Sequence, residues 1–158
     1  MVLTEFQLEY FCRGPDLFSP EFPLHTAASE GRIDIFQMIM EKAEDKNPAD
    51  QDGATPLHHA AAWGHFDICL LIMEQVEDKN PADARGWTPL HDASSGGHDD
   101  ICQLIMENVD EKNPMDITGR TPRDVATSTR FKSITTEFSK LRALKNVLEL
   151  CTGMPTWW

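Results

Sequence analysis

Residues 55–65 read Thr-Pro-Leu-His-His-Ala-Ala-Ala-Trp-Gly-His, and residues 88–98 read Thr-Pro-Leu-His-Asp-Ala-Ser-Ser-Gly-Gly-His. The two stretches begin 33 residues apart, and residues 50–82 match residues 83–115 at 20 of 33 positions by direct count. The same spacing separates four prolines, Pro23, Pro56, Pro89 and Pro122. A fixed period of this length indicates a fold built from repeated supersecondary units.

Each unit reads as two helices joined by a tight turn. Thr55 is a favourable N-cap residue, and Pro56 at the first helical position gives up no helical hydrogen bond. Gly64 suits the left-handed residue that ends the first helix. The second helix follows with apolar residues on one face at helical spacing, namely Ile68, Leu71 and Ile72.

Short polar motifs predict the end of the second helix and a reversal of the chain. Asn80-Pro81 stops the helix because proline cannot continue it. An Asp-x-x-Gly motif follows at residues 83–86 and predicts a turn. The neighbouring units carry the same motifs, with Asn-Pro at 47–48 and 113–114 and Asp-x-x-Gly at 50–53 and 116–119.

Together, the Thr-Pro-Leu-His, Ala-Ala and Gly-His signatures resemble the ankyrin-repeat family. The resemblance implies an all-α ankyrin-repeat solenoid of stacked antiparallel helix pairs, with projecting hairpin loops and divergent terminal caps. We expect an N-terminal capping segment at 1–16, a repeat domain at 17–148 and a C-terminal tail at 149–158. The repeats within that domain are predicted at 17–49, 50–82, 83–115 and 116–148.

The chain departs from the family pattern after each second helix. Ala43, Val76 and Val109 stand where the family usually has glycine. A β-branched residue resists a positive φ. We therefore expect these helices to end by another route, with an extra turn running into the Glu-Asp pair.

Both ends of the chain carry apolar residues outside the repeats. Residues 3–12 predict a short helix that covers the first repeat, and residues 134–148 predict a long cap helix rather than a dimer zipper. Trp157 and Trp158 end the tail either as a docking element or as a packed segment. The sequence leaves these two alternatives open.

Composition excludes several classes of protein. The 158 residues carry a net charge of −12, which argues against nucleic acid as a partner because phosphate binding needs clustered lysine and arginine. No apolar run approaches the length of a membrane span, and the N-terminus lacks the basic region of a signal peptide. We expect a monomer without membrane contact, in the cytoplasm or the nucleus.

No motif for a catalytic, cofactor or metal site stands out, so we expect neither enzymatic activity nor a bound cofactor. Histidines that recur once per unit read as structural, and the resemblance implies that His25, His58 and His91 hydrogen-bond the loops of adjacent units. The alternative is a zinc site at His59 with His91-Asp92. The four cysteines lack Cys-x-x-Cys spacing, so Cys69 and Cys102 read as small buried hydrophobic residues. Asn80 lies in a sequence that resembles, weakly, the context of hydroxylated ankyrin asparagines.

The resemblance also implies that hairpin tips and first helices line a concave face that binds another protein. Trp63 and Trp87 stand out there, because tryptophan is enriched in interface hot spots. Either ring could instead pack on a neighbouring repeat. We predict that Trp87→Ala weakens partner binding by ~2 kcal/mol or more without changing the melting temperature. The predicted binding residues are Gln51, Asp52, His59, Trp63, Arg85, Trp87, Asp92 and Arg120.

We therefore expect a non-enzymatic protein–protein interaction module that acts as an adaptor or scaffold. The alternative is an inhibitory or regulatory subunit that masks a partner enzyme or a transcription factor. A generic scaffold carries its specificity in a few surface side chains. The sequence consequently does not name the partner.

Overall fold

The computed structural model describes residues 23–128, 130–133, 135–136, 140–141 and 144. No helix in this part of the chain is long and apolar enough to cross a membrane. Within it, all the regular secondary structure is helical. The helices are α2 (Pro23–Ser29), α3 (Ile33–Lys42), α4 (Pro56–Trp63), α5 (Phe66–Met73), α6 (Pro89–Gly96), α7 (Asp99–Asn108) and α8 (Pro122–Val125).

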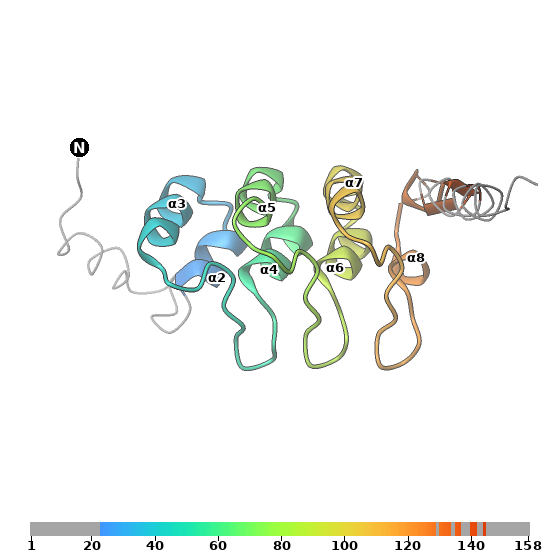
Figure 1. The fold of residues 1–158 in the computed structure, drawn as a ribbon, viewed down its shortest axis with the longest axis horizontal. Coiled ribbons are helices and arrows are strands. Elements are labelled where there is room, and N and C mark those ends of the chain that lie inside the picture. Colours follow the sequence, from blue (N-terminus) through green and yellow to red (C-terminus); the bar gives the residue numbers. More distant parts are fainter. Residues whose placement is uncertain (1–22, 129, 134, 137–139, 142–143, 145–158) are drawn as a thin grey trace, which may run out of the picture.

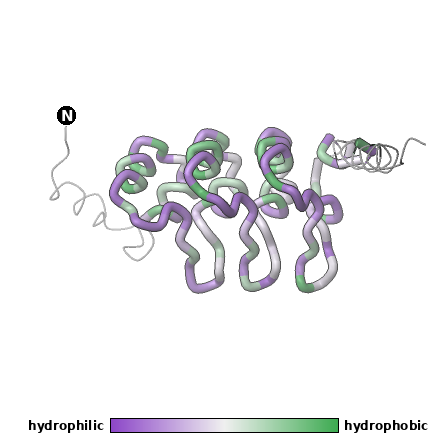
Figure 2. Tube along the Cα trace, viewed as in Figure 1, coloured by the Kyte–Doolittle hydropathy of each residue, from purple (hydrophilic) through white to green (hydrophobic). Residues whose placement is uncertain are grey.

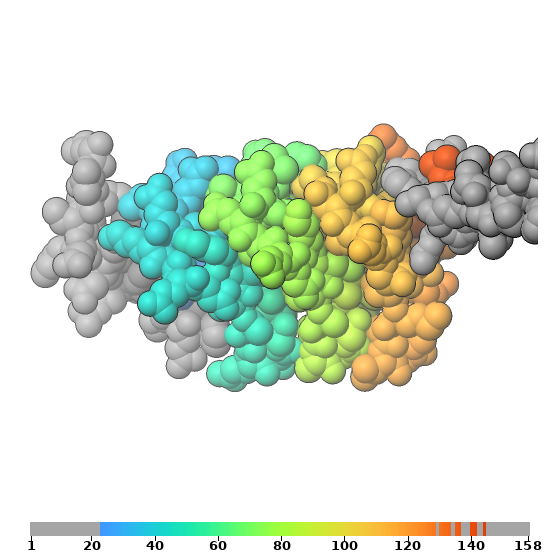
Figure 3. Space-filling view, viewed as in Figure 1, coloured from blue at the N-terminus to red at the C-terminus, as the bar shows by residue number. Residues whose placement is uncertain are grey.

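The helices form two rows, and hairpin loops project from one of them. The first helices α2, α4, α6 and α8 lie side by side, with α3, α5 and α7 in a second row and the hairpins extending away from that second row (Figure 1). Each first helix from α2 to α6 also packs against the second helix of its own unit. Neighbouring units touch along the length of the stack (Figure 3). This confirms the predicted all-α stack of helix pairs.

The first helices α4, α6 and α8 begin at capping boxes, as their Thr-Pro pairs predict. In α4, Nδ1 of His58 accepts the backbone N–H of Thr55 at 3.0 Å. In α8, the carboxylate of Asp124 takes this place and accepts the N–H of Thr121 at 2.9 Å. The change from histidine to aspartate in the last unit therefore keeps the cap, although α8 has only 4 residues.

The first helices of the two central units end at left-handed glycines. Gly64 has a φ of 80° and Gly97 a φ of 78°. A Cβ on Gly64 would lie 2.6 Å from the imidazole ring of His98 in the next unit. That ring is held in place because its Nε2 donates to the carbonyl of Ala62 at 3.2 Å. Gly64 is thus required for close packing between units as well as for its backbone conformation.

The second helices end without a left-handed residue. Ala43 and Val109 follow α3 and α7 directly in an extended conformation, and α5 ends at Met73, before Val76. No described residue other than glycine has a positive φ. The expected departure from the family ending is confirmed. The prediction of an extra helical turn is wrong, because the regular helix ends at or before Ala43, Val76 and Val109. The two valines are β-branched and prefer extended geometry.

Side chains of the Lys-Asn-Pro segments bind the ends of α3 and α7. The ammonium groups of Lys46 and Lys112 donate to the carbonyls of Met40 and Met106, near the ends of α3 and α7. A lysine at this position satisfies a carbonyl that lacks a helical partner and favours the negative end of the helix dipole. The asparagine that follows the lysine in these segments also has a structural role. In the segment that follows α5, Oδ1 of Asn80 accepts the N–H of Leu90 at 3.1 Å.

The core runs through the whole stack as one continuous cluster. Cys69 and Cys102 belong to it and are fully buried free thiols. Burial raises the pKa of both thiols to about 12, so they stay neutral and pack as small hydrophobic groups, as predicted. The largest fully buried apolar side chains are Phe36, Phe131, Met40, Leu57, Ile68, Ile72, Leu90, Ile101, Ile105 and Met106.

Several predictions lie outside the described residues. They stay predictions: the capping segment 1–16 with its helix at 3–12, the start of the first repeat at 17–22, most of the cap helix at 134–148, and the tail 149–158 with Trp157 and Trp158.

Candidate functional site

Each hairpin is folded around one aspartate. In the hairpin at residues 83–87, Oδ1 of Asp83 accepts the backbone N–H groups of Arg85 and Trp87, both at 2.8 Å. Gly86 donates its N–H to the Asp83 carbonyl at 2.9 Å and has a φ of 75°. Nε and Nη2 of Arg85 then donate to Oδ2 of Asp83 at 3.1 and 3.0 Å. The turn predicted from Asp-x-x-Gly is confirmed.

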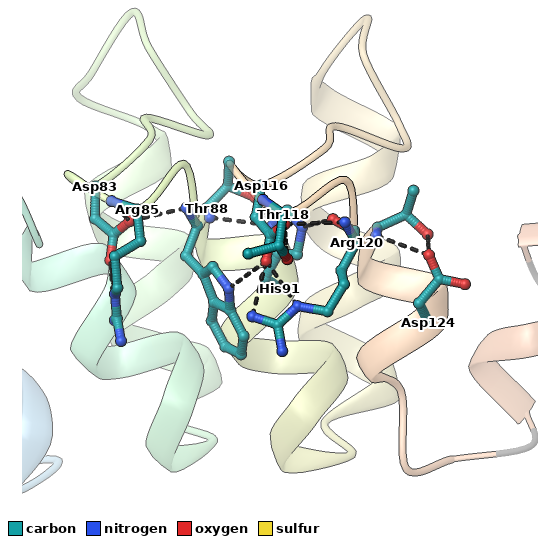
Figure 4. A network of polar contacts seen from close by, with 10 residues as sticks. Asp83, Arg85, Thr88, His91, Asp116, Thr118, Arg120 and Asp124 are labelled. Carbon is teal, nitrogen blue, oxygen red and sulfur yellow. Dashed lines mark hydrogen bonds and ion pairs between the residues drawn. The ribbon is translucent and has the colours of Figure 1, made fainter.

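Asp116 builds the next hairpin in the same way and also binds the one before it. Its Oδ1 accepts the N–H groups of Thr118 and Arg120 at 2.8 and 2.9 Å. Its Oδ2 accepts hydrogen bonds from Nε of Arg120 at 2.9 Å and from Nε1 of Trp87 at 3.1 Å (Figure 4). Two hairpins therefore share one buried carboxylate.

The hydrogen bonds determine the charge state of these two aspartates. Burial acts to raise the pKa of Asp83 and of Asp116, but the hydrogen bonds from their own hairpins outweigh it. The pKa of each carboxyl group is consequently below its ordinary value, so both are ionised at neutral pH. Ionised carboxylates accept the stronger, charge-assisted hydrogen bonds that keep the hairpins in one conformation.

Trp87 lies in a cluster of aromatic and basic side chains. Its ring stacks on the imidazole of His91, with centroids 5.6 Å apart and an interplanar angle of 24°. The guanidinium carbons of Arg85 and Arg120 each lie 5.7 Å from the Trp87 ring centroid. Packing on the neighbouring unit is therefore the correct alternative for Trp87. Because the ring makes a hydrogen bond between units, we now expect Trp87→Ala to lower the melting temperature as well.

Trp63 differs from Trp87 in both burial and contacts. It is the last residue of α4 and 66% exposed. Within the described residues, its indole makes no hydrogen bond. A large apolar ring is therefore mostly exposed to solvent on the row of first helices.

Three histidines connect each first helix to the hairpin of the following unit. Nδ1 of His58 accepts the Thr55 N–H, so the ring proton is on Nε2, which donates to the Trp87 carbonyl at 3.2 Å. His25 and His91 make the same bond to Ala54 and Arg120, at 3.1 and 3.2 Å. Burial lowers the pKa of all three imidazoles. The structural role implied by the family resemblance is confirmed.

His59 and Asp92 occupy equivalent positions in α4 and α6 but have different surroundings. Nε2 of His59 lies 3.7 Å from Oδ2 of Asp50. Asp92 has no such partner, because the equivalent aspartate, Asp83, carries the same negative charge and repels it. Burial, followed by the charge of Asp83, raises the pKa of Asp92 to about 7, against an opposing effect of Arg85. In the described part of the chain, no group donates a hydrogen bond to this half-buried carboxylate.

The zinc alternative at His59 and His91-Asp92 conflicts with this geometry. Both ring nitrogens of His91 are in use, one in the cap of α6 and one at the Arg120 carbonyl. Binding a metal there would break the link between two units. Among the described residues, no group of three or more His, Cys, Asp or Glu side chains is placed to hold a metal.

The predicted binding residues divide between the hairpins and the first helices. Gln51, Asp52, Arg85 and Arg120 are exposed on hairpins, and His59, Trp63 and Asp92 lie on α4 and α6. The structure brings Arg85, Trp87 and Arg120 into one cluster. Sequence reasoning did not single out Met115, which is 69% exposed beside the last hairpin. The sequence does contain a signal for Met115, because a large apolar residue stands there where the two preceding units have the small residues Ala49 and Ala82.

Comparison with protein families agrees with the repeat period and with this geometry. The profile for ankyrin repeats in three copies matches residues 6–83, and the profile for a single ankyrin repeat matches residues 85–116. The comparison with curated proteins gives no match. The matched residues include the capping boxes of α4 and α6, the left-handed glycines Gly64 and Gly97, and nearly all of the first two described hairpins. The chain therefore belongs to the ankyrin-repeat family.

Proposed function

We propose that this chain is a non-enzymatic adaptor or scaffold that binds another protein on the face formed by its first helices and hairpin tips. Ankyrin repeats are protein–protein interaction modules. The net charge of −12 disfavours nucleic acid as the ligand. We propose that it acts as a monomer in the cytoplasm or the nucleus.

The exposed indole of Trp63 is the observation that carries this proposal. A tryptophan that is 66% exposed on a regular helix is costly to hydrate and contributes little to the fold. Tryptophan is also among the residues most enriched at interface hot spots. Its helix, α4, belongs to the row of first helices from which the hairpins project (Figure 1).

The rigid hairpins support the same proposal. Arg85 and Arg120 are held by bonds to buried aspartates, while 70% and 53% of their side chains remain exposed. A guanidinium that is already oriented loses less entropy when it binds a partner. Together with Trp87, these two arginines present a preformed polar surface on the hairpins.

Affinity capture followed by titration calorimetry tests the proposal. Wild type, Trp63→Ala and the control Leu70→Ala are compared, because Leu70 is an exposed apolar residue in the other helix row. We expect Trp63→Ala to weaken binding of a captured partner by about 2 kcal/mol, roughly 30-fold in Kd, with an unchanged melting temperature. Loss of binding with Leu70→Ala alone would place the site on the second helices. Loss of a partner's own activity on binding would indicate an inhibitory subunit.

A further inference from the structure

The three described hairpins form a directional row of backbone hydrogen bonds. The N–H of Ala84 donates to the carbonyl of Asp52 at 2.9 Å, and the N–H of Ile117 donates to the carbonyl of Arg85 at 3.0 Å. The middle hairpin therefore donates to the hairpin before it and accepts from the hairpin after it. Thr118 is the residue equivalent to Asp52 and Arg85, and no described residue donates to its carbonyl.

The glycines of the hairpins show the same difference in packing. A Cβ on Gly53 would lie 3.0 Å from the backbone nitrogen of Ala84, and one on Gly86 would lie 3.1 Å from the backbone of Ile117. A Cβ on Gly119 would meet nothing within 4 Å. The first two hairpins are thus covered on this side by the next hairpin, whereas the side of the third hairpin is open in the described part of the chain.

The open hairpin is also the apolar one. Met115 is 69% exposed and Ile117 is 75% exposed, and Figure 2 shows a hydrophobic segment at the tip of this hairpin. Alanine stands at both equivalent positions of the preceding unit, Ala82 and Ala84. The hairpin is nevertheless well ordered, because Asp116 binds its backbone at two N–H groups.

We propose that this open side, formed by Met115, Ile117, the Thr118 carbonyl and Gly119, is a docking site for an extended backbone segment of another protein. The segment donates one N–H to the Thr118 carbonyl and places an apolar side chain against Met115 and Ile117. On the third hairpin, this segment occupies the position that the following hairpin occupies on each of the first two hairpins. This is a second contact surface, at the edge of the hairpin row, and it does not depend on Trp63.

The chemistry of the edge selects this occupant. The hairpin-to-hairpin interface occurs twice in the chain, and the third hairpin continues it with an unused acceptor. A second copy in a two-fold arrangement would place two Thr118 carbonyls against each other, acceptor facing acceptor. A segment with a free N–H, added as in strand addition to a sheet edge, satisfies the acceptor and covers the apolar pair.

A cyclised peptide with the sequence of residues 82–88 provides the probe, because its Ala84 N–H makes the equivalent bond in the chain. The peptide is titrated into the full ¹⁵N-labelled protein, with an otherwise identical peptide N-methylated at that alanine as the control. We expect saturable shifts of the amide signals of residues 117–120, and binding about fivefold weaker after N-methylation, the loss of one hydrogen bond. Equal binding of the two peptides, or shifts confined to other residues, would overturn the proposal.

Two protein variants locate the site independently. Ile117→Asp should abolish the shifts, whereas Ala84→Asp, at the equivalent position of a hairpin that is already covered, should leave the affinity unchanged. Circular dichroism establishes that both variants remain folded. Deletion of residues 149–158 is the third arm. Tighter peptide binding after deletion would identify the tail as the occupant and overturn the assignment to another protein.

Discussion

Replacing Asp92 by asparagine should stabilise this protein at neutral and alkaline pH. The Asp92 side chain is half-buried in α6, and burial together with the Asp83 carboxylate disfavours its charge. No described group donates a hydrogen bond to it. Asparagine has nearly the same shape and no charge, so the substitution removes an unfavourable interaction without opening a cavity.

The size of the effect follows from the pKa of Asp92, which is raised from 3.8 to about 7. A difference of about 3 in pKa between the folded and unfolded chain corresponds to ~4 kcal/mol. Part of the side chain meets solvent, which screens the repulsion, so we expect about 2 kcal/mol. Between pH 4 and pH 7 the folded chain holds a proton on Asp92 that the unfolded chain has released. Stability due to this group therefore falls as the pH rises through that window and levels off above it.

Urea unfolding of wild type and Asp92→Asn between pH 5 and pH 8.5 measures this effect. The difference between the two proteins isolates Asp92, because the buried histidines titrate in both. We expect the variant to be more stable by about 2 kcal/mol at pH 8 and by under about 1 kcal/mol at pH 5. Asp110→Asn, an equal change of charge at an exposed loop residue, is the control. A difference that does not vary with pH, or a variant less stable at pH 8, would refute the reasoning.

Three further predictions concern stability. Trp87→Phe removes the hydrogen bond from the indole to Asp116 and should lower the free energy of unfolding in urea by about 1 kcal/mol. Trp63→Phe should not lower it measurably. Gly96→Ala should destabilise by about 1–3 kcal/mol despite better helix propensity, since the new Cβ would lie 2.6 Å from an imidazole carbon, while Ser95→Ala should not. In the Asp92→Asn background, melting temperature should fall as the pH drops below 6.5, because the three buried histidines stay neutral only in the folded chain.

Local signals carried most of the fold prediction. Thr55-Pro56 and Gly64 act within one helical turn, so their effect can be worked out from the sequence alone. The ends of the second helices depend on contacts between residues that are further apart in the sequence. Lys46 and Lys112 fold back over six residues to bond helix carbonyls, which no local pattern displays. The absence of the family's glycine at Ala43, Val76 and Val109 is visible in the sequence, but the way in which these helices end is visible only in the structure.

The candidate site was harder to predict, because its residues depend on contacts between units. Trp63 and Trp87 look equally free in sequence, yet Trp87 bonds Asp116, 29 residues further along, and Trp63 stays exposed. His59 and Asp92 are recognisable as equivalent positions. The raised pKa of Asp92, however, results from burial and from the nearby charge of Asp83, and neither can be read from spacing.

The bonds from His58 and His91 to the next hairpin have an evolutionary consequence. They end on backbone carbonyls, at Trp87 and Arg120, so the distance between successive hairpin tips does not depend on which side chains the tips carry. Substitutions at residues such as 84 or 117 can therefore change what is recognised while the interval between contact points stays constant. New binding preferences can be acquired one tip at a time, without any compensating change in the core.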